Sequence, residues 1–184
     1  FLRSPETVKL MSGHDASTIR QRFYEITPEG RFAAVIRLLR HYRPVSTLAF
    51  CNTRQQCRDL VEALQTNGIV ALTLHGELDQ RERDQVLVQF AQRSCSVLVA
   101  TDVAARGLDI AQLEAVINVD ISPDPDVHVH RIGRTGRADA AGWAFSLVPP
   151  SNRARIDAIV TALAITPEWE TLDSLDESSE ALLP

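Results

Sequence analysis

The chain has 184 residues, which suits one domain or one domain with a tail, and its 45% hydrophobic content is enough to bury a core. It has no apolar run of roughly 18 residues and no charged-then-apolar leader, so we expect no membrane insertion or secretion and predict a cytoplasmic protein. Its net charge of −5 excludes a basic field over the whole surface. Three cysteines without a CxxC pair argue for a reducing compartment and against a zinc site, so we expect them in the core: Cys51, Cys57 and Cys95.

The charge is unevenly spread along the chain. Residues 168–184 hold six acids and no base, which leaves 19 bases against 18 acids in residues 1–167. The body is therefore near neutral, and any surface that binds an anionic polymer must be a local patch. We predict that residues 1–20 form a linker leading into the domain, that 21–165 form the domain, and that 166–184 form an acidic, flexible tail.

Strands and helices alternate along the first half of the chain. Residues 21–26 are a candidate strand, and Pro28 opens a helix with apolar residues at the 3.6-residue spacing until Pro44 closes it. The continuous apolar run at 47–50 is typical of a strand covered on both faces. The next predicted elements are a helix capped by Thr53 and closed by Asn67 and Gly68, a strand at 70–74, a helix from about Asp79 and a strand at 97–100.

The second half continues the alternation. We predict a strand at 116–119, a helix that starts after Pro123, a strand at 143–148 and a closing helix that bears Ile156 and Leu163. Alternating strands and helices indicate an α/β fold, with a mostly parallel sheet and helices on both faces.

Short polar segments follow three of these strands: Asn52–Thr53, His75–Gly76 and Thr101–Asp102. The carboxyl ends of parallel strands share one edge, where open α/β folds bind ligands and where helix N-termini present N–H groups suited to phosphate. A single such segment is usually only a helix cap. Three of them on one edge favour a binding site.

Residues 130–137, with the sequence HRIGRTGR, concentrate cationic side chains. Arg131, Arg134 and Arg137 recur every third residue, so on a helix or tight turn they could converge on one anionic object such as phosphate. Gly133 and Gly136 would let the backbone come close to a ligand. The alternative is a solvated basic helix end, although two glycines that each weaken a helix by about 1 kcal/mol count against it. Local reasoning leaves both interpretations open.

The segment 130–137 resembles motif VI of the superfamily 2 helicases, most closely that of the DEAD-box ATP-dependent RNA helicases. Residues 50–53 resemble motif IV of that family, and residues 100–109 resemble motif V. His75–Gly76, with Gln80 and Arg83, resembles an RNA-contacting segment. These motifs stand in the family's order, and the resemblance covers residues 20–165. It implies the C-terminal RecA-like domain of such an enzyme.

The resemblance also implies roles in ATP chemistry. It makes Arg134 and Arg137 arginine fingers that offset charge on the transferring γ-phosphoryl group. It places His130 and Arg131 at contacts with the other motor domain, although a lone histidine is more often structural. Gly107 and Asp109 would hold the ATP ribose, whereas Asp109 taken alone would be a helix cap.

A second group of residues would contact the RNA backbone without reading sequence. By resemblance this group consists of Asn52, Thr53, Gly76, Gln80, Arg83, Thr101, Asp102 and Arg106. Taken alone, Asp102 could equally be a turn former. Gln80 and Arg83 lie three apart on one predicted helix and should face the same way.

The sequence contains neither a G-x-x-x-x-G-K-[ST] phosphate loop nor the residues D-E-A-D. The resemblance implies that ATP with Mg²⁺ is bound together with an N-terminal RecA-like domain of the same chain, which would supply these motifs. We therefore expect negligible ATPase or unwinding activity from these residues alone. Residues 74–85 and 127–130 are similar to bacterial family members associated with ribosomal RNA, which makes ribosomal RNA one candidate target. Two alternatives stay open: the second motor domain of a DNA-directed superfamily 2 ATPase, and a non-catalytic module that binds RNA or a protein.

Overall fold

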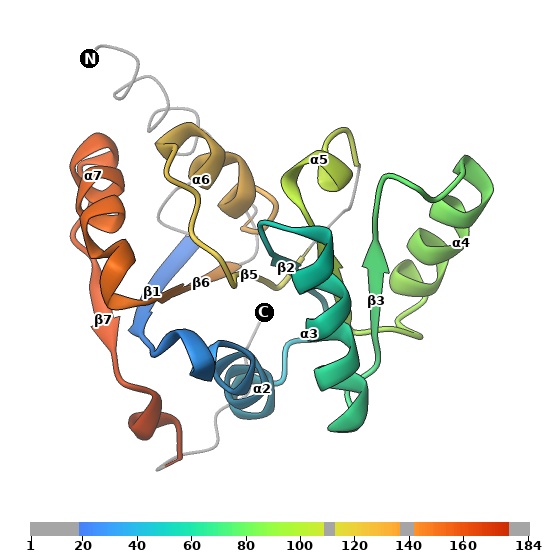
Figure 1. Ribbon diagram of the computed structural model, residues 1–184, viewed down its shortest axis with the longest axis horizontal. Helices are drawn as coiled ribbons and strands as arrows, with labels where there is room; N and C mark the ends of the chain where they lie inside the picture. Colours follow the sequence, from blue (N-terminus) through green and yellow to red (C-terminus); the bar gives the residue numbers. More distant parts are fainter. Residues whose placement is uncertain (1–18, 109–112, 137–141, 177–184) are drawn as a thin grey trace.

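The computed structural model describes residues 19–108, 113–136 and 142–176. In these ranges seven strands form one sheet in the order β3-β4-β2-β5-β6-β1-β7, and each neighbouring pair is parallel (Figure 1). The strands are β1 Ile19–Glu25, β2 Thr47–Phe50, β3 Ala71–Leu74, β4 Val97–Ala100, β5 Ala115–Asn118, β6 Gly142–Val148 and β7 Glu168–Glu170. The predicted parallel α/β fold is confirmed.

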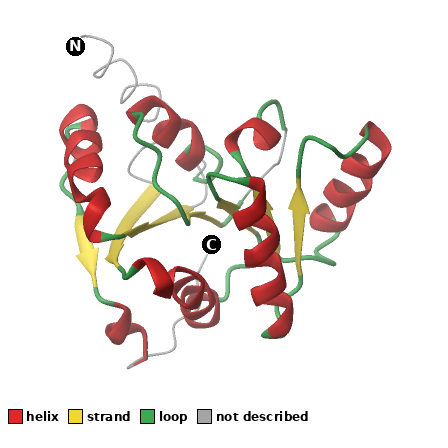
Figure 2. Ribbon diagram, in the orientation of Figure 1, coloured by secondary structure: helices red, strands yellow, loops and turns green. Residues whose placement is uncertain are grey.

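Helices and short 3-10 turns connect the strands (Figure 2). The helices are α2 Arg31–Tyr42, α3 Arg54–Thr66, α4 Gln80–Ala91, α5 Asp102–Ala105, α6 Pro125–Ile132 and α7 Arg153–Leu163. The 3-10 turns are η2 Pro28–Gly30, η3 Pro150–Asn152 and η4 Leu172–Asp176. No helix in the described ranges is long and apolar enough to cross a membrane.

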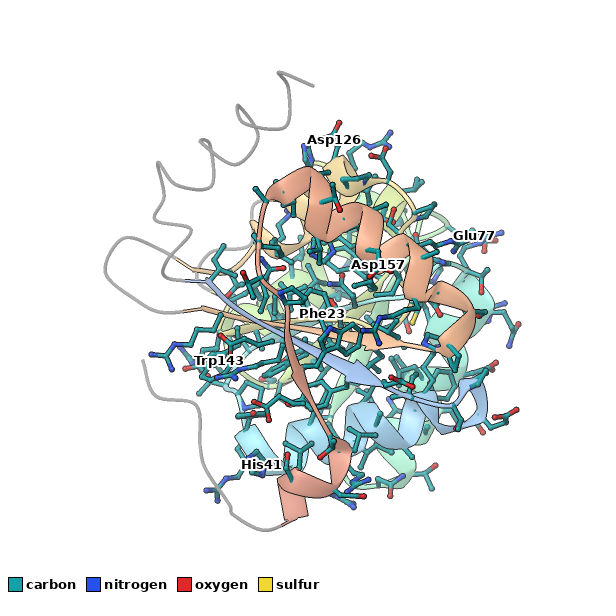
Figure 3. The ribbon with its side chains drawn as sticks, turned by 90° about the vertical axis from the view of Figure 1, so that its left-hand side faces the viewer. Phe23, His41, Glu77, Asp126, Trp143 and Asp157 are labelled. Atoms are coloured by element: carbon teal, nitrogen blue, oxygen red, sulfur yellow. The ribbon has the colours of Figure 1, made fainter. Side chains whose placement is uncertain are left out.

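Alternating residues of the strands pack against opposite helix layers. In β2, Ala49 joins the cluster that holds the apolar faces of α2 and α3, whereas Leu48 and Phe50 join the cluster of α4 and α5. A third cluster packs α6 and α7 on β1 and β6. Figure 3 shows the two sides, with His41 on α2 below the sheet and Asp126 on α6 above it. The three cysteines are buried free thiols, as predicted.

Two helix starts follow the sequence signals closely. The Thr53 hydroxyl accepts a hydrogen bond from the Gln56 amide at 3.1 Å and caps α3. Asp79 caps α4 through a reciprocal pair with Glu82, at 2.8 and 3.0 Å. Such caps satisfy amides that have no partner within the helix, which explains why both helices begin at these residues.

The predicted flexible tail is wrong for residues 166–176, which belong to the domain. Strand β7 pairs with β1, and Arg22 bridges Glu168 and Glu170, the latter at 2.8 Å. The Trp169 ring packs against the Arg153 guanidinium, whose central carbon lies 4.0 Å from the ring centre. In η4, Leu175 is buried, and its carbonyl oxygen lies 2.7 Å from Nδ1 of His41. Residues 1–18 and 177–184 lie outside the described ranges.

Candidate functional site

The polar segments predicted at one sheet edge do lie side by side. Phe50 pairs with Ala100, and Ala100 pairs with Leu74, so the residues that follow β2, β3 and β4 leave the sheet together. Helices α3, α4 and α5 begin at this edge (Figure 1). The first turn of a helix carries amide groups that have no partner within the helix. We call this surface the strand edge: Asn52, Thr53, Gly76, Gln80, Thr101, Asp102 and Arg106.

Several members of the predicted RNA group make contacts within the domain. Thr53 and Thr101 are helix caps, since the Thr101 hydroxyl accepts from the Ala104 amide at 3.3 Å. Gln80 is exposed and donates to Asp84, whereas Arg83 is half-buried and donates to the Ala104 carbonyl at 3.4 Å. The two side chains therefore do not act as one exposed pair, because Arg83 reaches across to α5.

Arg131 lies inside the domain rather than on its surface. Its side chain is 1% exposed and forms a two-point ion pair with Asp102, with Nε and Nη2 each 2.7 Å from a carboxylate oxygen. Nη1 donates to the Asp120 carbonyl at 2.6 Å and to Asn118 Oδ1 at 3.4 Å, and Nη2 donates to Asn52 Oδ1 at 3.3 Å. The Phe50 ring lies under the guanidinium at 5.0 Å.

This geometry argues against the interdomain contact predicted for Arg131. A guanidinium carries five N–H groups, and five acceptors of the same domain surround this one. No donor remains for a second domain. The neighbouring His130 is exposed, so its predicted interdomain role is compatible with its position.

The network around Arg131 includes three buried residues that the sequence motifs did not indicate. Asn118 donates to the Ser146 hydroxyl at 3.0 Å, and both are buried between strands β5 and β6. Asp120 accepts from the Asn52 amide at 2.8 Å and pairs with Arg31 at 3.3 Å. The available signal was the presence of Asn118 and Asp120 in the apolar run 116–121, where buried polar groups require partners.

Arg134 lies in the turn that follows α6, and its side chain reaches the end of α5 and the turn after it. Its Nη1 donates to the Leu108 carbonyl at 2.6 Å, and its Nη2 donates to the Ala105 carbonyl at 3.1 Å. Arg131 and Arg134 therefore bind different groups and do not converge on one object as expected, because α6 ends at Ile132. Both line a pocket of about 280 Å³ between α5 and α6, to which Asp102, Arg106, Asp126 and His130 also contribute. Arg137 and Asp109 lie outside the described residues.

Glycines shape the two turns beside Arg134. Gly107 has φ 77° and open space where a Cβ would stand, and Gly136 has φ 78°, so both occupy conformations that favour glycine. Gly133 is different: it ends α6 with φ −65°, and a Cβ there would lie 3.1 Å from the Val129 carbonyl. A Cβ on Gly142 would lie 2.3 Å from the Gly136 nitrogen, so the arginine segment packs backbone to backbone against β6.

His128 is a buried titratable group on α6. Its Nε2 lies 3.1 Å from Gln21 Oε1, and burial, followed by the charge of Arg131, lowers its pKa to about 4. In the unfolded chain its pKa is about 6.5, so the unfolded state binds the proton more readily. The stability that a neutral His128 provides is therefore complete above about pH 6.5 and is lost as the pH falls towards 4.

We expect the free energy of unfolding to fall by about 3 kcal/mol between about pH 7 and pH 4 through this residue. Urea unfolding at several pH values in that range measures how the free energy of unfolding depends on pH. His128→Gln keeps a hydrogen-bond donor near Gln21 but does not titrate. Its free energy of unfolding should therefore fall by about 3 kcal/mol less over the same pH range. The same pH dependence of the free energy of unfolding in both proteins would contradict the lowered pKa of His128.

Comparison with known proteins places the chain in a family. Residues 30–139 match the helicase conserved C-terminal domain, and the chain belongs to that family. It is 47% identical over 169 residues to the ATP-dependent RNA helicase DbpA of Escherichia coli strain K12, a match that covers 92% of this chain and 37% of DbpA. The chain thus spans little more than a third of that relative.

Solved structures agree with this assignment. The C-terminal domain of the DEAD-box protein Dbp5 matches with a TM-score of 0.81 and 30% identity, covering 89% of this chain and 96% of that one. A DEAD-box protein from Methanococcus jannaschii matches with a TM-score of 0.78 and 32% identity, covering 87% of this chain and 43% of that one. The chain is therefore a RecA-like DEAD-box C-terminal domain, as its motifs predicted.

Proposed function

We propose that this chain is the second motor domain of an ATP-dependent RNA helicase. In this proposal the strand edge binds the RNA backbone, and Arg134 acts on ATP at an interface with an N-terminal RecA-like domain. The observation that carries it is the alignment of the ends of β2, β3 and β4, which brings three predicted RNA-contacting segments onto one surface.

The chemistry of the strand edge suits a phosphate backbone. The N-termini of α3 and α4 present amides there, and Arg106 is exposed beside them. The ring pairs in the described ranges do not include residues of this edge, and Phe50 at the end of β2 is buried under Arg131, which favours contacts to phosphate and sugar over base stacking. Binding should therefore depend little on RNA sequence.

The residues near Arg134 also fit a nucleotide. A half-buried arginine fork faces the pocket, and Gly107, in the turn whose Leu108 carbonyl accepts from Arg134, has open space where a Cβ would stand. ATP supplies the phosphoryl group that is transferred, and Mg²⁺ would be held by the N-terminal domain, since this sequence lacks the phosphate loop and D-E-A-D. We infer that Asp109 would hold the ribose and that Arg137 would be a second finger.

The proposal extends to the RNA target and to the cellular process. The 47% identity to DbpA supports the bacterial subfamily that residues 74–85 and 127–130 resemble. We therefore infer ribosomal RNA as the target, and ribosome biogenesis in the cytoplasm as the process.

The test compares ATP hydrolysis by this chain alone and by the protein that joins it to the N-terminal RecA-like domain. We expect no hydrolysis above background from the chain alone. RNA should stimulate ATP hydrolysis by the joined protein about tenfold more than DNA of the same sequence does. Equal stimulation by DNA would favour a DNA-directed ATPase, and RNA binding without any hydrolysis would favour a non-catalytic module.

A further inference from the structure

We propose that Arg131 positions the RNA-binding strand edge from inside the domain, by neutralising Asp102 and by fixing the orientation of the Asn52 amide. This inference rests on the proposed function, because it assumes that the strand edge meets RNA phosphates. It assigns Arg131 as a positioning residue, which touches neither RNA nor ATP.

The first step concerns the charge of Asp102. Its side chain is 38% exposed at the start of α5, on the surface where phosphates would lie. A free carboxylate there would repel RNA. The two-point ion pair with Arg131, at 2.7 Å for both contacts, cancels that charge while both Arg131 nitrogens stay buried. Arg131 thus removes a repulsive group from the strand edge.

The second step concerns the direction of the Asn52 amide. Its oxygen accepts from Arg131 Nη2, and its backbone amide donates to Asp120. The oxygen is held on the inner side, so the NH₂ group of this exposed residue faces outward with two donors. Donors suit phosphate oxygens, whereas an outward oxygen would oppose them.

The third step is that a buried arginine is required for both effects. Asn52 follows β2 and Asp102 follows the neighbouring β4, and the planar fork of Arg131, which extends from α6, reaches both. A lysine ammonium could not match two carboxylate oxygens and three further acceptors in one plane. The shape of the side chain therefore matters as much as its charge.

The experiment measures binding of a fluorescent oligouridylate by the full protein, with both motor domains and a non-hydrolysable ATP analogue. Arg131→Met should raise the Kd by about tenfold or more. Adding Asp102→Asn should recover about fivefold or more of that loss, because the uncompensated carboxylate is gone. The kcat for ATP hydrolysis at saturating RNA should stay within about threefold, so the defect appears in the KM for RNA.

A second variant keeps the proposal testable if Arg131→Met folds poorly. Asn52→Asp preserves an acceptor for Arg131 but turns the outward donors into a negative oxygen, and it should weaken binding by about tenfold. The matched control is Asn67→Asp, the same change at the other end of α3, which should bind within about twofold of wild type.

Two results would overturn the inference: wild-type affinity in Arg131→Met or Asn52→Asp, or a double variant that binds no better than Arg131→Met. Failure of the proposed function would look different. In that case the wild-type protein itself would not bind the oligouridylate, or RNA would not stimulate its ATPase.

Discussion

Replacing Arg134 with alanine is expected to lower the kcat for RNA-stimulated ATP hydrolysis by about 10²-fold or more, with little change in the KM for RNA. The guanidinium lies in the pocket between α5 and α6, held on the carbonyls of Ala105 and Leu108. An arginine that offsets charge on the γ-phosphoryl group acts on the transition state, and such residues contribute roughly 10³ to 10⁵ in rate. The protein to measure is the one that contains both motor domains.

The comparison includes a matched arginine on another helix. Arg155→Ala, an exposed position on α7, should leave kcat within about twofold. Arg134→Lys keeps the charge but loses the fork, so it should recover only part of the rate. A near-normal kcat in Arg134→Ala, with folding intact, would mean that this residue only ties α6 to the turn after α5.

Replacing Arg131 with methionine is expected to lower the free energy of unfolding of this chain by about 3 kcal/mol. Removing one partner of a buried ion pair typically costs about 3–5 kcal/mol, and the partial exposure of Asp102 places this pair near the lower end. The buried Asn118 oxygen and the Asp120 carbonyl also lose a donor. Urea unfolding with a shared m-value measures the difference.

The control for this prediction is an exposed ion pair near the same edge. Arg54 and Glu77 lie 2.7 Å apart, but their side chains are 54% and 66% exposed. Arg54→Met should therefore cost less than about 1 kcal/mol. Equal effects at Arg131 and Arg54 would show that the buried network contributes no more to stability than a surface pair.

Local sequence signals predicted most of the fold. The apolar runs at 47–50 and 97–100 match β2 and β4 because a strand covered on both faces needs no polar alternation. Thr53 and Asp79 marked the starts of α3 and α4, because a cap is a contact within four residues. The strand edge followed from these elements, since all parallel strands end on one side.

Local sequence signals did not predict the contacts between residues that are distant in the chain. The spacing of Arg131 and Arg134 suggested a common direction, but α6 ends between them, and the acceptors of Arg131 come from other parts of the chain. Similarly, residues 166–176 looked like a solvated tail because their acids have no local partner. Arg22, which pairs with Glu168, lies 146 residues earlier.

The position of β1 between β6 and β7 affects how the domain folds during synthesis. Ile19 pairs with Gly142, and Arg22 pairs with Glu168, so the first strand leaves the ribosome long before either neighbour exists. At about 5–20 residues per second, the delay is on the order of ten seconds. Phe23 and Tyr24, fully buried in the finished sheet, stay accessible to chaperones for that time. We therefore expect the β2, β3 and β4 half of the sheet to assemble before β1 pairs with β6, and β7 to join β1 last.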